Sequence, residues 1–537
     1  MSAEPTALLT FSIGPVHSFI GQARRIADLW AGSAILSDVT GAALTVLSSF
    51  PGTKPIFPAP DSRGKLPPGL PNRFVARVPA SQAAAIAKAM EERVSATWSE
   101  IVQSAVNVLS NVEIDTKAQW HSASWRDAIT TAWSWVPEGD DYKAASEEGA
   151  RLFGASRVYR PFTQSSAAGT KCAICGERNA LPNGRLADIR EAWQKAERLA
   201  RSKSLAQYFR PDQGRLCLVC AAKRLYPEAG DQSAKAKFRS FEDFQPEDEN
   251  AGRSPGRNSR PYFAVVTMDG DHLGERLGGT PGMTGAELEA YQAQVSHVLS
   301  AFAETLRTKD SASLRLKDLM VDSAAPQHAP QLIYAGGEDV LFVADPRDAL
   351  PMARAIQSLY SSMFDAVPGL SSEDFTISAA VVFAHTSVPA GVLFNDADRL
   401  LVEKAKGESD RNSVAVAMHK RSGPPVQRAF RWNEGWVERI NETRDALRDR
   451  KLASRQTYDL AEADRILKDV FGSNEEQWET WLRYRLGQGE GSAAHVEGLL
   501  ALLKPFFLKR KTEGLRIARF IAIEATPPQS SVPKGAP

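Results

Sequence analysis

Two stretches decide the fold: YFAVVTMDGD at residues 262–271 and LIYAGGEDVLF at residues 332–342. The first is an apolar run that ends in acidic residues, as expected of a buried strand that meets a turn. The second has apolar runs on both sides of a Gly-Gly pair, which predicts a β-hairpin. With the helix and strand patterns around them, residues 259–425 follow the order βα, ββ hairpin, α, β, α. This order predicts a ferredoxin-like palm domain built on an antiparallel sheet.

The sequence on either side predicts three further regions. Residues 1–115 alternate strand and helix patterns and indicate a small α/β sandwich. Residues 116–258 combine a tryptophan-rich stretch, which we expect to be helical, with four cysteines and a linker at 226–260 that is rich in Pro, Gly, Ser and charge. Residues 426–537 carry amphipathic helix patterns and predict a C-terminal helical bundle.

The composition excludes several classes of protein. The chain has 537 residues, of which 43% are hydrophobic and 24% charged, and this balance excludes collagen-like, coiled-coil and wholly disordered proteins. The formal net charge of +1 means that a nucleic acid would have to be bound by a local basic patch. No run approaches the roughly 18 apolar residues of a membrane span, and the N-terminus lacks the basic start of a secretory signal. We therefore expect a cytoplasmic protein without a membrane partner.

The two decisive stretches contain four acidic residues. Asp269 and Asp271 end the first strand, and Glu338 and Asp339 stand at the tip of the hairpin. Because these strands are neighbours in a palm sheet, the four carboxylates should meet and supply the hard oxygen ligands that Mg²⁺ or Mn²⁺ requires. Two such ions could activate a 3′-hydroxyl and hold a leaving pyrophosphate. The alternative, two unrelated solvated turns, is disfavoured because the clustered carboxylates would repel one another without a cation.

Glycines and lysines beside these acids suit a nucleotide. Gly270, Gly336 and Gly337 lack side chains, so backbone N–H groups there could approach a triphosphate closely. Lys404 and Lys406, on a basic helix further along the chain, could offer positive charge to the phosphates. We therefore expect these five residues to bind nucleotide.

The four cysteines form two C-x-x-C pairs, Cys172 with Cys175 and Cys217 with Cys220. Four thiolates in this spacing suit a structural, tetrahedral Zn²⁺ site, although the separation of the pairs is longer than in compact zinc ribbons. Free buried thiols are the alternative. Loss of zinc should unfold this region rather than abolish chemistry directly.

The sequence resembles a known family at SIGPVHSFIGQARRIADLWAGSAILS (12–37), at the two decisive stretches and at EKAKGESDRNSVAVAMHKRSG (403–423). These residues are similar to the large polymerase-like subunit of type III CRISPR effector complexes, most closely the III-B form, over about residues 6–425. The resemblance implies two ferredoxin-like palm domains with a zinc-binding insert between them. With the helical bundle predicted after them, the expected fold class is mixed α/β (α+β).

The resemblance also implies an activity and partners. In that family the second palm carries a GGDD motif and converts ATP into cyclic oligoadenylate when target RNA is bound, with other effector subunits and guide RNA as partners. Asp269, Glu338 and Asp339 match the family's metal-binding carboxylates, and Asp271 is a helper. Glu338 departs from GGDD, but glutamate is still an oxygen ligand, so we expect activity to survive.

Two further expectations concern the first palm and nuclease activity. The first palm lacks an equivalent carboxylate pair, and we expect it to hold the acceptor nucleotide near Ser33 and Ser37, with simple helix packing as the alternative. None of the eight histidines is followed by aspartate, so we expect no HD-type DNase. Two alternatives to the cyclase stay open: a palm nucleotidyltransferase that makes a different adenylated product, and a catalytically silent scaffold of the complex.

Overall fold

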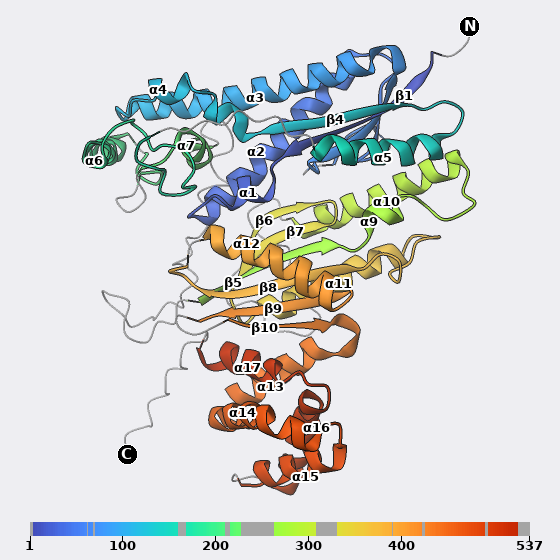
Figure 1. Cartoon of the computed structure of the whole chain (residues 1–537), viewed down its shortest axis with the longest axis vertical. Helices are drawn as coiled ribbons and strands as arrows, with labels where there is room; N and C mark the ends of the chain where they lie inside the picture. The colour runs from blue at the N-terminus through green and yellow to red at the C-terminus, as the bar shows by residue number, and fades with distance from the viewer. Residues whose placement is uncertain are drawn as a thin grey trace.

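The computed structural model describes residues 4–524 except 62, 68–69, 159–167, 204, 210–214, 227–261, 308–329, 389, 421–424 and 489–491. From residue 227 on, the predicted linker lies outside the described residues. Figure 1 shows the described chain as three stacked parts: a first domain that includes the cysteine region, a second domain below it, and C-terminal helices at the far end.

The first domain is a four-stranded antiparallel sheet in the order β2-β3-β1-β4. Along the chain its strands and crossover helices form a βαββαβ unit, so the predicted α/β sandwich is a ferredoxin-like fold. The elements are β1 (Thr6–Gly14), α1 (His17–Gly21), α2 (Ile26–Thr45), η1 (Val46–Ser49), β2 (Lys54–Phe57), β3 (Arg73–Pro79), η2 (Ala80–Gln82), α3 (Ala83–Asn111) and β4 (Thr130–Pro137).

The expectation that the tryptophan-rich stretch is helical is wrong for its second half. Short helices α4 (Lys117–Trp120) and η3 (Ala123–Ala128) precede β4, which pairs with β1 over its whole length. Trp133 and Trp135 alternate with small residues along β4 and sit opposite Phe11 and Leu9, and this period of two is that of a strand. The first sheet therefore extends past the expected boundary at residue 115.

The second domain repeats this topology and adds two strands. Its sheet has the order β10-β9-β8-β5-β7-β6, in which β8, β5, β7 and β6 correspond to β4, β1, β3 and β2 of the first sheet. The predicted ferredoxin-like palm is thus confirmed. Its elements are β5 (Tyr262–Gly270), α9 (Leu273–Arg276), α10 (Gly285–Leu306), β6 (Gln331–Gly336), β7 (Asp339–Ala344), α11 (Ala349–Asp365), β8 (Ile377–His385), α12 (Ala390–Leu400), the π-helical segment η6 (Leu401–Glu408), β9 (Ser413–His419) and β10 (Val426–Arg431).

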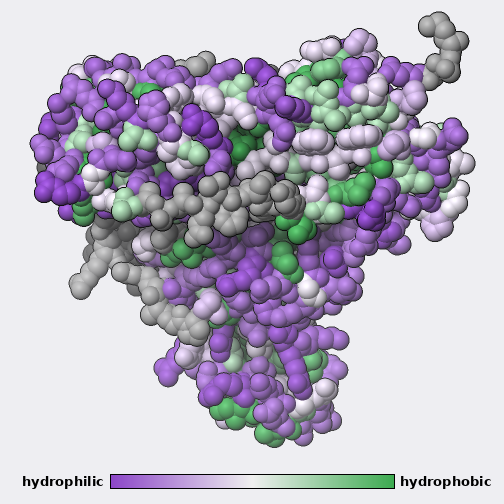
Figure 2. Space-filling model, turned by 45° about the horizontal axis from the view of Figure 1, so that its top comes forward, coloured by the Kyte–Doolittle hydropathy of each residue, from purple (hydrophilic) through white to green (hydrophobic). Residues whose placement is uncertain are grey.

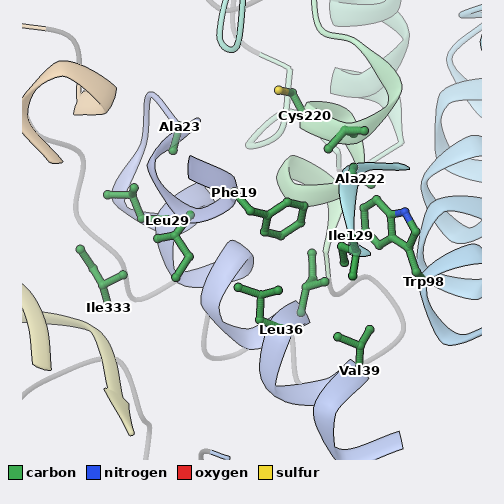
Figure 3. Close-up of a cluster of buried hydrophobic side chains, with 14 of the residues drawn as sticks. Phe19, Ala23, Leu29, Leu36, Val39, Trp98, Ile129, Cys220, Ala222 and Ile333 are labelled. Carbon is green, nitrogen blue, oxygen red and sulfur yellow. The ribbon is translucent and has the colours of Figure 1, made fainter. Parts of the chain in front are cut away.

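The two faces of the second sheet contribute to different cores. Phe263 and Val265 of β5 join the cluster that also fills the first domain, whereas Val266 and Met268 join the cluster under α10, α11 and the C-terminal helices. Figure 3 shows the first cluster, where Phe19 and Trp98 point toward each other from α1 and α3. The two domains therefore share one continuous core.

Charged and polar contacts also join the two domains. The Arg77 guanidinium on β3 donates to Glu138, just after β4, at 2.6 Å and to Glu289 on α10 at 2.8 Å. The hydroxyl of Tyr142 donates to Gln292 on α10 at 2.6 Å. Because all these groups are largely removed from water, they fix the angle between the domains.

Two regions complete the chain. The cysteine region carries α5 (Tyr142–Val158), α6 (Leu186–Ser202) and α7 (Leu218–Leu225). The predicted C-terminal helical bundle is confirmed as η7 (Trp432–Glu434), α13 (Trp436–Arg448), α14 (Ser454–Phe471), α15 (Glu475–Leu486), α16 (Ala493–Leu508), α17 (Glu513–Arg519) and η8 (Phe520–Glu524). Its helices pack against the second sheet through Trp436, Phe506 and Phe520.

One helix corrects the expectation about membrane spans. Among the described residues, Ile26–Ser49 is long and apolar enough to cross a membrane by length and composition, but 56% of its most apolar window is buried inside the protein. Ile26, Ile35 and Val39 on this helix are fully enclosed in the first core. On the face shown in Figure 2, apolar residues form scattered patches among polar ones. We therefore describe α2 as a core helix.

Candidate active site

Three of the four predicted carboxylates meet at one end of the second sheet. Strands β5 and β7 are antiparallel neighbours with Met268 opposite Val340, so the next residues along, Asp269 and Asp339, face each other across the two strands. The hairpin between β6 and β7 closes tightly because Gly337 adopts a left-handed backbone with φ of 63°. Glu338 occupies its tip. The structure therefore places Asp269, Glu338 and Asp339 together, as the sequence predicted.

These carboxylates perturb one another electrostatically. Burial, followed by the negative charge of Asp269, raises the pKa of Glu338 to about 7. Burial, followed by the charges of Glu338 and Asp269, raises the pKa of Asp339 well above its ordinary value. The three carboxyl groups lie close together and partly enclosed, so their negative charges repel one another. A divalent cation bound between them would neutralise this repulsion. The donor set therefore fits Mg²⁺ or Mn²⁺.

Lys406 is the cation that the protein itself supplies. Its ammonium lies 2.5 Å from Oδ2 of Asp269 and donates to the carbonyl of Gly270 at 2.8 Å. The lysine is carried by η6, and π-helical turns of this kind occur often at functional sites. Lys404, in contrast, forms an ion pair with Glu408 on the same segment. The structure thus places one of the two predicted lysines in the cluster.

Asp271 lies beside the cluster, with its Oδ1 3.8 Å from the Lys406 ammonium, but other groups hold its carboxylate. It is 2% exposed, and its carboxylate accepts hydrogen bonds from Thr376 at 2.8 Å, from Ser378 at 2.8 Å and from the backbone N–H of Asn412 at 3.0 Å. Because these donors occupy both oxygens, the predicted role of Asp271 as a metal ligand has no support in the geometry. Asp271 instead ties the end of β5 to the turn at 410–412, where three successive residues adopt positive φ angles.

The three predicted glycines serve different purposes. A Cβ at Gly270 would lie 2.8 Å from Cβ of Glu338, and a Cβ at Gly336 would lie 2.6 Å from Cζ of Tyr334. These two glycines therefore allow the strand ends to pack closely. A Cβ at Gly337 would have no neighbouring atom within 4 Å, so this position alone of the three leaves open space for a phosphate.

A cleft opens beside the acids, between the first and second domains. It encloses about 770 Å³, part of it open to solvent, and Asp269 and Asp339 stand in its wall. The rest of the wall is mostly apolar and includes Val16, Ile20, Leu341, Phe394 and Leu401. Its residues come from α1, β5, β7, α12 and η6 and from the chain next to them. No sequence pattern indicates that these segments lie side by side. Most ligand-binding clefts combine such apolar walls with a few polar groups.

Ser33 and Ser37 lie next to this cleft. Both stand on the face of α2 that turns toward β6, where they line a small cavity together with Tyr334. Neither lines the larger cleft. Their predicted proximity to the opposing domain is therefore seen, and their contact with an acceptor nucleotide stays a prediction.

The four cysteines form a compact cluster. The sulfurs of Cys172, Cys175, Cys217 and Cys220 all lie within 4.8 Å of one another, and those of Cys175 and Cys217 are 3.8 Å apart. A tetrahedral site with Zn–S bonds of about 2.3 Å has sulfurs about 3.8 Å apart. The cluster therefore fits a metal such as zinc.

Helix α7 connects this cluster to the cleft. Cys217 is its N-cap, and the Cys217 sulfur accepts the N–H of Cys220; about one turn after Cys220, Lys223 is buried with 1% exposure. The Lys223 ammonium donates to the carbonyls of Phe19 at 2.6 Å and Gln22 at 2.5 Å, at the end of α1. Since α1 forms one wall of the cleft, the cysteine cluster holds that wall in place.

The fold and the site define the class of the protein: a palm domain of the nucleotidyltransferase type, paired with a second, similar domain. Residues 262–415 match the family described as Cas10/Cmr2, second palm domain, and residues 8–103 match CRISPR-associated protein Cmr2, N-terminal. These two matches confirm the resemblance found in the sequence, to the large subunit of type III CRISPR effector complexes.

One curated relative and several solved structures support this assignment. The chain is 24% identical over 269 residues to the CRISPR system Cmr subunit Cmr2 of Pyrococcus furiosus; the match spans 46% of this chain and only 31% of that protein's length. Type III-B Cmr-beta in its apo state matches with a TM-score of 0.59 at 12% identity, covering 94% of this chain and 77% of that one. The Csm1-Csm4 cassette in complex with AMPPNP matches with a TM-score of 0.50 at 13% identity, covering 97% and 70%. At these identities, the likeness shows a shared fold.

Proposed function

We propose that this chain is the large subunit of a type III CRISPR effector complex and that it converts ATP into cyclic oligoadenylate when the complex binds target RNA. The observation that carries the proposal is the meeting of Asp269, Glu338 and Asp339 beside a cleft between two palm-like domains. The matches to the Cas10/Cmr2 second palm domain and the Cmr2 N-terminal family support it, as does the fold shared with a protein solved with AMPPNP. ATP, other effector subunits, guide RNA and target RNA are the proposed partners, in the cytoplasm.

The reaction follows from the chemistry of the site. The 3′-hydroxyl of one ATP gives up its proton to water and attacks the α-phosphate of another, so that a P–O bond forms and pyrophosphate leaves with the electrons of the broken P–O bond. Asp269, Glu338 and Asp339 would hold Mg²⁺ or Mn²⁺, which, when bound, supplies charge neutralisation and lowers the pKa of the hydroxyl. Repetition followed by ring closure gives a cyclic product.

The protein's own groups position the substrate. The apolar wall formed by Ile20, Phe394 and Leu401 suits the face of an adenine ring. The N–H groups of the hairpin around Gly337 can approach a phosphate, because no side chain fills that space. Lys406 lies next to Asp269 and can turn its ammonium toward phosphate oxygens once a divalent cation neutralises that carboxylate.

The experiment measures pyrophosphate release by the assembled complex with target RNA, ATP and Mn²⁺, and identifies the product by mass. Asp339→Asn should lower the rate at least about 100-fold, as expected when a ligand of the reacting cation is lost. The control is Glu373→Gln, because Glu373 is exposed on a loop of the same domain. Equal rates for wild type and Asp339→Asn would leave the scaffold alternative, and linear or non-adenylate products would favour a different transferase.

A further inference from the structure

Helix α1 forms one wall of the cleft but is too short to hold its own position. It spans only His17–Gly21, and isolated helices of this length are not stable in water. Val16 and Ile20 line the cleft on one side of this helix. A Cβ at Gly21 would lie 3.6 Å from Cβ of Phe394, so α1 also touches α12 of the second domain. Contacts from outside the helix must therefore fix its place.

Lys223 supplies such contacts at the C-terminal end of α1. Its ammonium donates to the carbonyls of Phe19 at 2.6 Å and Gln22 at 2.5 Å, and it lies 5.1 Å from the centre of the Phe19 ring. The last carbonyls of a helix have no partner within the helix, and a lysine can satisfy them. Cδ of Lys223 lies 3.5 Å from where a Cβ of Gly32 would be. The lysine stem therefore runs along α2 before its ammonium reaches α1.

Two further contacts join the cysteine region to the end of α1. The Gln22 side chain donates to Glu177, just after the first cysteine pair, at 2.9 Å. The Arg25 guanidinium donates to the carbonyl of Gln207 at 2.7 Å. Both contacts are exposed, whereas Lys223 is 1% exposed. Because charged hydrogen bonds are stronger away from water, Lys223 should contribute most to the position of α1.

Helix α7 gives Lys223 a fixed base. Cys217 is the N-cap of this helix and belongs to the cysteine cluster. Arg224, next to Lys223, donates to Asp28 of α2 at 2.8 Å, and both side chains of this ion pair are 3% exposed. The helix is therefore held at its start by the cluster and against α2 by a buried ion pair.

We propose that Lys223 is a positioning residue for the cleft: it fixes α1 relative to the cysteine cluster, and α1 then presents Val16 and Ile20 to the substrate. Lys223 itself does not line the cleft, so it acts through α1. This inference rests on the proposed function and adds to it a link from the cysteine region to substrate affinity. Loss of Lys223 should weaken substrate binding and leave the chemical step unchanged.

The test measures hydrogen exchange along residues 16–23 and the kinetics of pyrophosphate release, both in the assembled complex with target RNA. Lys223→Met removes the ammonium and keeps an apolar stem. Exchange at the amides of Ile20 and Gln22 should accelerate at least about tenfold, because two enclosed hydrogen bonds to the end of α1 are lost. KM for ATP should rise about tenfold, with kcat within about threefold of wild type.

Lys203→Met is the matched control. The Lys203 ammonium, in the same region, donates at 2.7 Å to the carbonyl of Asn111, the last residue of α3. This contact is of the same kind but is made to α3 instead of α1, so exchange along α1 and KM should stay within about twofold of wild type. Gln22→Ala removes the exposed contact with Glu177 and should accelerate exchange along α1 about twofold. It provides the test if Lys223→Met does not fold, as judged by thermal unfolding.

The outcomes separate this proposal from the proposed function. Unchanged exchange and unchanged KM in a folded Lys223→Met complex with as much zinc as wild type would overturn the role of Lys223. A loss of kcat at unchanged KM would overturn it too, as would a loss of zinc or equal effects in Lys203→Met. A wild-type complex that releases no pyrophosphate would overturn the proposed function, and faster exchange along α1 in Lys223→Met would still support the positioning role.

Discussion

The two sheets share one strand order but differ at the corresponding strand ends. Gly14 ends β1 in the first sheet, and Gly270 ends β5 in the second. A Cβ at Gly14 would have no neighbour within 4 Å, whereas a Cβ at Gly270 would press on Glu338. The same topology thus brings the first strand beside a hairpin twice, but only the second sheet places carboxylates there. The fold determines where strand ends meet, and the side chains at those ends determine the chemistry.

The two halves also differ in the kind of metal that their residues suit. The first half carries four sulfur ligands in an enclosed cluster, which is typical of a structural zinc site. The second half carries three carboxylates beside an open cleft, which suits an exchangeable Mg²⁺ or Mn²⁺. Loss of the first cluster should therefore act on stability, and loss of the second on chemistry.

The largest expected effect on stability comes from the thiolate cluster. Cys217→Ser should release the metal and unfold the region around α7, because roughly 10 kcal/mol of zinc binding can be coupled to folding. Zinc content and thermal unfolding are measured. Asp269→Asn is the matched change in the other cluster, and it should alter the unfolding free energy by less than about 1 kcal/mol because its ion pair with Lys406 is partly exposed. Similar losses of unfolding free energy in both variants would contradict the proposed difference between the clusters.

Arg77→Ala should weaken the contact between the domains. It leaves Glu138 and Glu289 without their shared partner, which should cost about 3 kcal/mol of unfolding free energy. Hydrogen bonds from Arg77 hold the pKa of Glu289 below its ordinary value of 4.5. This contribution to stability is complete above about pH 4.5 and is lost as the pH falls below it. Denaturant unfolding at pH 7 and pH 4 should show a smaller difference between wild type and variant at the lower pH, and Arg73→Ala is the control.

The paired glycines offer a smaller and more specific test. Gly270→Ala should cost about 1–3 kcal/mol of unfolding free energy, because its Cβ forces Glu338 to move, and it should also reduce pyrophosphate release. Gly14→Ala changes the corresponding position of the first sheet. It should alter the rate of pyrophosphate release by less than about twofold and the unfolding free energy by less than about 0.5 kcal/mol. If both substitutions were harmless, the close approach of β5 to the hairpin would not matter for the site.

A further effect is the pH dependence of the acid cluster without divalent cations. The folded-state pKa of Glu338, about 7, is above its ordinary value of 4.5, so the folded protein retains a proton that the unfolded chain releases. Stability should therefore fall as the pH rises from about 4.5 to 7 and stay level above that. Thermal unfolding in the presence of a chelator measures this slope. Glu338→Gln should reduce this slope without removing it, because burial also raises the pKa of Asp339, and an unchanged slope would place the titrating group elsewhere.

The second sheet and its acids could be predicted from the sequence because one strand and one hairpin carry both the apolar pattern and the acidic residues. The sequence could not predict the cleft, since Val16, Ile20, Phe394 and Leu401 meet only through the packing of the two domains. The sequence could not show that Asp271, just past the end of β5, is held by Thr376, Ser378 and Asn412, and its role as a metal ligand stays a prediction. The helix expected over β4 was wrong because the alternation of Trp133 and Trp135 with small residues, which is the period of a strand, was not recognised within a tryptophan-rich stretch.

The π-helical course of η6 sets the direction in which Lys406 points. A π-helical turn holds more residues than an α-helical one, so each residue of η6 rotates the chain by less than the roughly 100° of an α-helix. If the same residues wound as an ordinary α-helix, Lys406 would turn away from Asp269 without any change of side chain. In this segment, the winding of the backbone contributes to the site as directly as the identity of its residues.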